Sequence, residues 1–275
     1  MWLWVLLVTA LAFPAQQAPA TAVAAATQPK NSKIWIGRYA EFEEFLRTAK
    51  IVRTVGTPVG VLAPRHAIFE PGGLANGAGV KTIAPGKRDG YFESYKSEIA
   101  AYKLDRLLQL DMVPPTIERR FERDLASWQL WIDDTRMLKE IQAQKAKDPN
   151  AERWNRQWHR VQVFDDLVGN IDENAGNLLF DPAWNFIKID HSRAFTDILT
   201  PPFDVKIKVK RIDRPFFERI KALNRATVTK EIGDWLTENN AMNALFSRRD
   251  AIVKAFEELA KQNGEGQVFE AWPEQ

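Results

Sequence analysis

The pattern of apolar and polar positions changes about halfway along the chain. Before residue 135, short β-branched and apolar runs such as "RTVGTPVGVL" and "RHAIF" are interrupted by Gly and Pro, which is typical of strands. From Met137 onward, apolar residues recur at helical spacing, and Trp154, Trp158 and Val161 line one face of a long predicted helix. The pattern therefore predicts an α+β protein with a strand-rich first half and a helical second half.

Two helices and a hairpin are predicted within the first half. A short helix is expected over residues 39–50, and two strands over 117–121 and 125–132 pair through a tight turn. The segment "YFESYKSEIAAYKLDRLLQLDMVPPT" gives the clearest helix, because Ala101, Leu104 and Leu108 share one face. Pro114 is expected to close that helix.

One hairpin interrupts the helical second half. The short runs "NLLF" and "NFIKI" read as two strands, separated by the turn sequence "DPAW". From Pro215 to the end, the spacing predicts two or three amphipathic helices.

Composition narrows the possible functions. The 275 residues are 45% hydrophobic and 27% charged, as in ordinary folded domains. The formal charge is only +2, so no global field attracts nucleic acid or an anionic membrane. The chain has no cysteine, which excludes disulfides, thiolate zinc sites and a cysteine nucleophile. The three histidines have no zinc-motif spacing, and the ten tryptophans are expected to serve packing.

The N-terminus predicts export. The first charged side chain is Lys30, and an apolar run from Trp2 to Phe13 leads into an Ala-rich stretch. We interpret residues 1–26 as a signal peptide with its small-residue exit, because the apolar run is shorter than a spanning helix of roughly 20 residues. Export would be to a periplasm or to the outside of the cell. No Lys or Arg precedes the run, so an uncleaved membrane anchor or a misplaced start remains an alternative.

Candidate chemistry gathers in "GNIDENAGNLLFDPAWNFIKIDHSRAF", residues 169–195. Asn177 and Asp190 lie on opposite arms of the predicted hairpin, which brings an amide oxygen and a carboxylate together. Mg²⁺ binds such hard oxygen donors and shares its shell with phosphate and water. Asp172 is placed to accept the proton of an incoming hydroxyl. The structural alternative is a polar turn, since Asp and Asn also favour turns.

Lys81 and Glu98 are the candidates in the first half. Lys81 follows four glycines, in "GGLANGAGVKTI", on a short predicted strand. Glu98 lies at the edge of the apolar helix face, where a carboxylate requires a cation. Alternatively, Lys81 is a solvated strand lysine, and Lys87 or Arg88 is the functional cation in its place. The alternative for Glu98 is a surface position in a network with neighbouring residues of the same helix.

The loop and hairpin resemble those of atypical kinase-like families. "GNIDENAGN" is similar to their "GNxDxxxxN" loop, and "IDHSRAF" to their "IDxxxxF" segment. The families are the HipA-type kinases, the secretory-pathway kinases and the phosphatidylinositol kinases, and the likeness runs over about residues 55–200. It implies that Asp172 is the catalytic base and that Asn177 and Asp190 bind Mg²⁺ or Mn²⁺.

The same resemblance implies a two-lobed protein-kinase-like fold that binds ATP. The strand-rich N-lobe would span residues 30–134 and the helical C-lobe residues 135–275, with a hinge near 131–134. Lys81 would contact the nucleotide phosphates and Glu98 would pair with it. Two departures stand out: there is no G-x-G-x-x-G, and "EN" follows the catalytic aspartate where HipA-type loops often have Arg and His.

The function expected from the resemblance is ATP- and metal-dependent transfer of phosphate to a hydroxyl. A protein Ser or Thr is the first candidate acceptor, followed by a lipid or a small molecule. One alternative is a catalytically inactive module that binds nucleotide or a partner, which the two departures favour. Another is a nucleotidyl transferase on the same fold. The presence of Asp172, Asn177 and Asp190 together favours an active site.

Overall fold

The computed structural model describes residues 32–56, 64–201 and 209–271, and the structural statements below concern these residues. The expected signal peptide, residues 1–26, lies outside them. So do residues 57–63, which include the second part, 57–62, of the stretch "RTVGTPVGVL" that was predicted to be strand.

The first half forms an antiparallel sheet covered on one face by a helix. Its strands, in spatial order, are β1 (Ile51–Gly56), β2 (Arg65–Phe69), β3 (Gly77–Lys81), β7 (Asp124–Leu130) and β6 (Thr116–Phe121). Helix α1 (Tyr39–Thr48) packs Phe42 and Leu46 against Trp128 on the sheet. Val80 is buried in the same cluster. Because side chains alternate along a strand, the neighbouring Lys81 points to the other face of the sheet.

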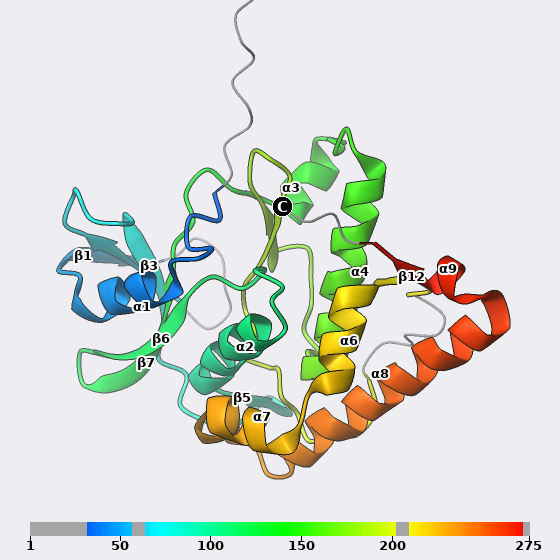
Figure 1. Ribbon diagram of the computed structural model, residues 1–275. Coiled ribbons are helices and arrows are strands. Elements are labelled where there is room, and N and C mark those ends of the chain that lie inside the picture. Colours follow the sequence, from blue (N-terminus) through cyan, green and yellow to red (C-terminus); the bar gives the residue numbers. More distant parts are fainter. Residues whose placement is uncertain (1–31, 57–63, 202–208, 272–275) are drawn as a thin grey trace, which may run out of the picture.

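Helix α2 (Tyr95–Leu107) lies between this sheet and the helical part of the molecule (Figure 1). The helix was expected to begin at Tyr91 and extend to Pro114, and both limits are wrong. Tyr91–Glu93 is strand β5, paired with β4 (Gly86–Arg88), and Ser94 caps the helix by accepting a hydrogen bond from the Lys96 amide at 3.0 Å. At the other end, Gln109 has a left-handed backbone that an α-helix cannot contain.

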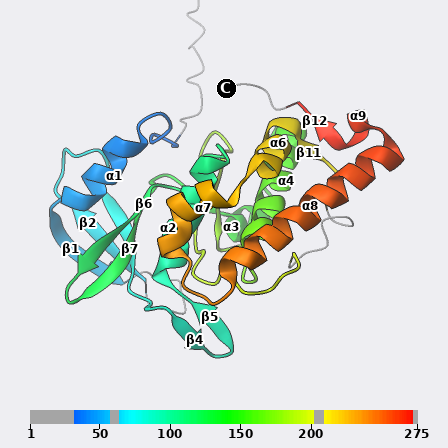
Figure 2. The same ribbon diagram turned by 60° about the horizontal axis from the view of Figure 1, so that its bottom comes forward.

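The second half is mainly helical. Its elements are β8 (Arg136–Met137), α3 (Leu138–Ala143), α4 (Ala151–Val168), β9 (Leu178–Phe180), β10 (Phe186–Lys188), β11 (Ile212–Asp213), α6 (Arg214–Ala222), α7 (Arg225–Ile232), the 3₁₀ turn η1 (Gly233–Trp235), α8 (Ala241–Asn263), α9 (Glu265–Val268) and β12 (Phe269–Glu270). The predicted hairpin is present as β9 and β10. In Figure 2 the β4–β5 hairpin projects from the lower edge of the molecule.

The helical pattern that begins at Met137 corresponds to two helices, and the long helix predicted to carry Trp154 and Val161 is the second of them, α4. Lys145 has a left-handed φ of 51°, which ends the first helix. Asn150 then caps α4 by accepting a hydrogen bond from the Arg153 amide at 2.9 Å. The apolar spacing alone did not reveal this break, because both segments bury side chains in the same core.

The apolar residues form two clusters, one under the sheet and a larger one among the helices. Trp35 and Trp128 are fully buried in the first cluster, while Trp154 stacks on Phe180 in the second with ring centroids 4.8 Å apart. These tryptophans serve packing, as expected. In the part of the chain that the structure describes, none of the helices has the length and apolar character needed to cross a bilayer.

Candidate functional site

Lys81, Glu98 and Asp190 meet between the sheet, α2 and the end of the β9–β10 hairpin. The Lys81 Nζ lies 2.5 Å from Glu98 Oε1 and 2.7 Å from Asp190 Oδ1. The other oxygen of Glu98 accepts a hydrogen bond from the His191 backbone amide at 3.0 Å. Glu98 is buried, whereas the side chains of Lys81 and Asp190 are 18% and 37% exposed. We call these three side chains the cleft cluster.

The charges of the cleft cluster stabilise one another. Burial opposes the charge of Lys81, but Asp190 and then Glu98 outweigh it and raise the pKa of the ammonium above its usual value. Lys81 in turn lowers the pKa of Asp190 despite the burial of that carboxyl. The burial of Glu98 rules out the surface network considered for it. Arg88, the alternative to Lys81, instead lies on β4 and donates to the Gly86 carbonyl.

Asp172 and Asn177 lie in the loop that follows α4. The helix ends at Gly169, whose left-handed φ of 65° turns the chain. The buried Asn177 side-chain amide donates to the Asp172 carbonyl at 3.0 Å, which closes the loop across its base. The Asp172 side chain remains 46% exposed, and Arg193 Nη1 donates to its Oδ2 at 3.1 Å.

The hairpin register places Asn177 and Asp190 at the same open end. Leu178 pairs with Lys188, and beyond this pair the Ile189 amide donates to the Asn177 carbonyl at 3.0 Å. Asp190 has a left-handed φ of 64°, and Ser192 Oγ donates to its Oδ1 at 3.1 Å. The two predicted metal ligands therefore lie on opposite arms at the same end of the hairpin, as expected from the sequence.

The donor types at this end fit Mg²⁺ or Mn²⁺. An amide oxygen from Asn177 and a carboxylate from Asp190 are the hard donors that these ions bind. Among residues 32–56, 64–201 and 209–271, no three His, Cys, Asp or Glu side chains could hold a metal by themselves. An ion would therefore complete its shell with phosphate and water oxygens, as magnesium usually does in nucleotide sites.

A second lysine with two carboxylates, not anticipated from the sequence, lies behind the loop. Lys188 is fully buried, and its Nζ lies 2.9 Å from Asp165 Oδ2 and 2.5 Å from Glu173 Oε2. Asn170 also donates to Asp165, at 3.0 Å. Glu173 is the first residue of the "EN" pair that departs from the HipA-type loop. Through Lys188 of β10 it connects the loop to Asp165 of α4. We call Lys188, Asp165 and Glu173 the buried cluster.

A buried arginine on α8 holds the end of α4. Arg248 Nε donates to the Leu167 carbonyl at 3.0 Å, and Nη1 donates to the Thr196 carbonyl at 3.1 Å. Its guanidinium lies so close to Gly169 that a Cβ added there would be 2.7 Å from the guanidinium carbon. Arg248 therefore links the start of the Asp172 loop to the segment after Asp190. The sequence pattern gave no sign of this contact.

One glycine of the run before Lys81, Gly77, serves close packing in the sheet. The His66 side chain lies directly against Gly77. A Cβ at this position would be 2.6 Å from the imidazole Nε2, which is too close for any residue with a side chain. His66 stacks on Trp131, with ring centroids 3.8 Å apart, and the Trp131 amide donates to the Gly77 carbonyl. The glycines of this run lie between β2 and β3 and on β3 itself. The connection from β1 to β2 falls largely on residues 57–63, outside the described ranges.

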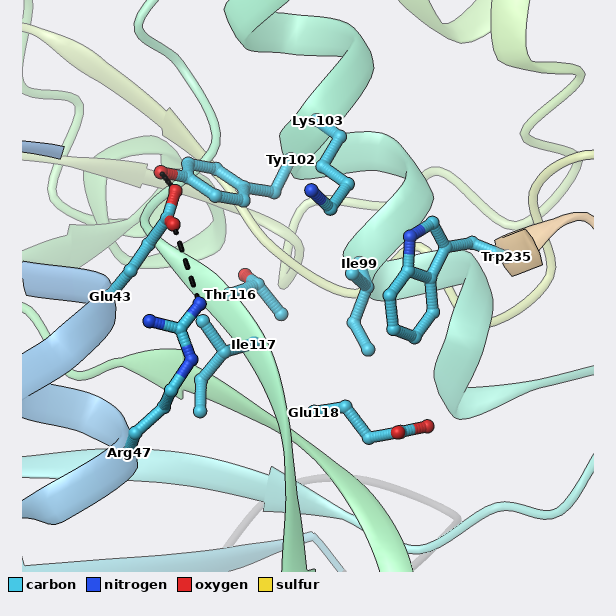
Figure 3. A pocket seen from close by; sticks show the side chains of 9 residues that line it. All are labelled: Glu43, Arg47, Ile99, Tyr102, Lys103, Thr116, Ile117, Glu118 and Trp235. Atoms are coloured by element: carbon cyan, nitrogen blue, oxygen red, sulfur yellow. Dashed lines mark hydrogen bonds and ion pairs between the residues drawn. The ribbon is translucent and has the colours of Figure 1, made fainter. Parts of the chain in front are cut away.

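A cavity of about 270 Å³ lies beside α2 and contains none of the predicted site residues. Figure 3 shows Ile99 and Tyr102 of α2, Trp235 of η1, and Glu43 and Arg47 of α1 around it. Ile99 follows Glu98 directly in the sequence. The wall of this cavity and the carboxylate that holds Lys81 therefore belong to the same helical turn.

Comparison with known proteins identifies the fold. No protein-family model matches the chain, and no curated protein matches its sequence. The Golgi casein kinase with Mn and ADP bound superposes with a TM-score of 0.62 at 14% identity, over 86% of this chain and 80% of that one. Hydra Fam20 with sugar gives 0.61 at 14% identity, over 85% and 92%. The Helicobacter pylori proinflammatory kinase CtkA gives 0.52 at 14% identity, over 79% and 98%.

These solved structures share the arrangement of a strand-rich and a helical lobe, which confirms the two-lobed α+β architecture predicted from the sequence. The division of the chain after residue 134 stays a prediction, as do the roles of the individual site residues. The chain has an atypical protein-kinase-like fold.

Proposed function

We propose that the protein is a phosphotransferase that uses ATP with Mg²⁺ or Mn²⁺ and transfers phosphate to a hydroxyl group. The observation that carries this proposal is the cleft cluster, in which Lys81 contacts both Glu98 and Asp190. The likeness to a kinase structure solved with Mn and ADP supports the choice of ligands.

Each residue has a distinct task in the proposed reaction. Lys81, held by Glu98, contacts phosphate oxygens of the nucleotide. Asn177 and Asp190 would hold the metal, which when bound would supply positive charge where negative charge develops on the transferred group. Asp172 accepts the proton of the acceptor hydroxyl. That oxygen forms its bond to phosphorus while the bond to the leaving nucleoside diphosphate breaks.

The exposure of Asp172 supports an acceptor that arrives from solvent. A protein Ser or Thr is our first candidate for this acceptor, and a lipid or small-molecule hydroxyl is the second. The short apolar run from Trp2 to Phe13 and the Ala-rich stretch after it support a location outside the cytoplasm, with the mature chain beginning after about residue 26.

Thermal unfolding with and without ATP and Mg²⁺ or Mn²⁺ tests the nucleotide site, with Asp190→Ala as the comparison. A ligand that binds only the folded state adds about 2.7 kcal/mol at a hundredfold excess over its Kd. We expect a metal-dependent rise of the unfolding midpoint in the native protein and its loss in Asp190→Ala. No rise with any nucleotide and metal would refute the proposal.

The mass of a modified acceptor tests the type of transfer. A phosphotransferase adds a phosphate, whereas a nucleotidyl transferase adds a whole nucleotide. Binding of ATP with neither modification nor hydrolysis would identify an inactive nucleotide-binding module instead. Asp172→Asn is the matched control, because it removes the proposed base and leaves the metal ligands in place.

A further inference from the structure

Arg193 connects the Asp172 loop to the β4–β5 hairpin. Its Nη1 donates to Asp172 Oδ2 at 3.1 Å, while Nε lies 2.7 Å from Glu93 Oε1. The guanidinium carbon also lies 4.6 Å from the centre of the Tyr91 ring. One side of the planar guanidinium is thus bound to the hairpin, and the remaining nitrogen is directed at Asp172.

Glu93 gives Arg193 a fixed anchor. Its carboxylate is 1% exposed, and Arg193 Nη2 also lies 2.7 Å from the same Oε1. The second Glu93 oxygen accepts no hydrogen bond from the described residues. A buried carboxylate needs a cation beside it, and Arg193 supplies that cation. The guanidinium therefore has little freedom to move away from its position.

The Asp172 carboxylate depends on this contact for its orientation. The loop fixes the backbone of Asp172, because Asn177 donates to its carbonyl. Within the described ranges, the side-chain oxygens of Asp172 have no hydrogen-bond partner other than Arg193. A half-exposed aspartate without such a partner would sample several rotamers in water.

We infer that Arg193 is a positioning residue that orients the Asp172 carboxylate, and that Glu93 and Tyr91 of the β4–β5 hairpin hold Arg193 for this task. The inference rests on the proposed function, because Asp172 needs an orientation only as the proton acceptor. A hairpin that precedes α2 thereby controls the geometry of the loop that follows α4.

Arg193→Met removes the contact and keeps an apolar stem of similar length. We expect kcat for Mn²⁺-dependent ATP hydrolysis to fall on the order of tenfold to hundredfold, the usual effect of a small misplacement of a reacting group. The KM for ATP and the ATP-induced rise of the unfolding midpoint should not change, since Lys81, Asn177 and Asp190 are untouched. Arg193→Lys should restore part of kcat.

Amide hydrogen exchange supplies a readout that does not depend on turnover. In Arg193→Met the amides of residues 170–176 should exchange faster than in the native protein. Arg120→Met is the matched control, because its guanidinium donates to the Arg123 carbonyl in an exposed contact at the β6–β7 turn, away from the candidate site. That variant should leave both the exchange and the kinetics unchanged.

The outcomes separate this inference from the proposed function. Unchanged kcat and exchange in Arg193→Met, with an active native protein, would overturn the inference alone. Loss of the ATP-induced rise together with kcat would also overturn it, since Arg193 would then support the whole site. A native protein that binds ATP but neither hydrolyses nor transfers it would overturn the proposed function, and the inference with it.

Discussion

The cleft cluster and the buried cluster have the same composition, one lysine with one aspartate and one glutamate. In each, a lysine bridges two carboxylates, and Lys188 precedes Asp190 by two positions. They differ in access to solvent, because Lys188 is fully buried whereas Lys81 and Asp190 are partly exposed. The set of residue types, one lysine with two acids, thus does not by itself distinguish a ligand site from a structural one.

The difference in exposure decides what each cluster can do. A charge that no ligand can reach contributes only to the fold, and its loss leaves the partner carboxylates buried without a counterion. A partly exposed lysine can exchange one carboxylate for a phosphate oxygen while the other keeps it in place. Exposure, together with the nearby Asp172 loop, is what qualifies the cleft cluster as the candidate site.

The largest expected effect is on stability, from Lys188→Met. Removing the ammonium leaves the buried Asp165 and the mostly buried Glu173 without their cation, and breaking such a buried pair lowers the free energy of unfolding by about 3–5 kcal/mol. Urea denaturation followed by tryptophan fluorescence measures this change. A loss no larger than that of a surface substitution would show that the buried cluster contributes little to the fold.

Lys81→Met should separate binding from stability. Water reaches the partly exposed Asp190, and the buried Glu98 keeps the hydrogen bond from the His191 amide, so we expect a loss of about 1–3 kcal/mol in the absence of ligand. The ATP-induced stabilisation, about 2.7 kcal/mol at a hundredfold excess over Kd, should disappear. Unfolding with and without Mg²⁺ and ATP measures both. Retained ATP stabilisation would contradict the assignment of Lys81.

A further expected effect concerns the pH dependence of stability. Burial raises the pKa of Glu173 from 4.5 to about 7, although Lys188 opposes the shift. The folded state therefore binds this proton more tightly than the unfolded state. The contribution to stability is complete below pH 4.5 and is lost as the pH rises to about 7.

Glu173→Gln removes this titration and should flatten the fall of stability over that range. Urea midpoints at several pH values, with Glu122→Gln in the exposed β6–β7 turn as the control, measure the difference. A slope identical in Glu173→Gln and the native protein would mean that Glu173 stays ionised within the folded chain.

The candidate site was predictable where it depends on local order and spacing. Asp172 and Asn177 share one loop, and the turn at Pro182 returns the chain so that Asp190 lies beside Asn177. Alternation along β3 directs Lys81 away from the apolar cluster that contains Val80. These relations follow from strand and turn geometry, which the sequence carries directly.

Contacts between distant segments could not be predicted in this way. Lys188 of β10 pairs with Asp165 of α4, which lies 23 positions earlier in the sequence. The sequence "NFIKI" around Lys188 does not show whether this lysine is buried or solvated. The β4–β5 hairpin was missed because Tyr91 and Phe92 continue the apolar spacing of α2. Arg193 reaches Glu93 across 100 positions, a distance over which residue patterns give no information about contact.

The close contact of Gly169 with Arg248 also constrains how related chains can vary. A side chain at position 169 meets two obstacles, since the left-handed backbone disfavours it and the guanidinium occupies its space. A descendant of this protein that keeps Arg248 must therefore keep glycine at 169, whereas a shorter residue at 248 removes one obstacle. The two positions should change together, and this coupled variation would mark relatives whose overall sequences have diverged.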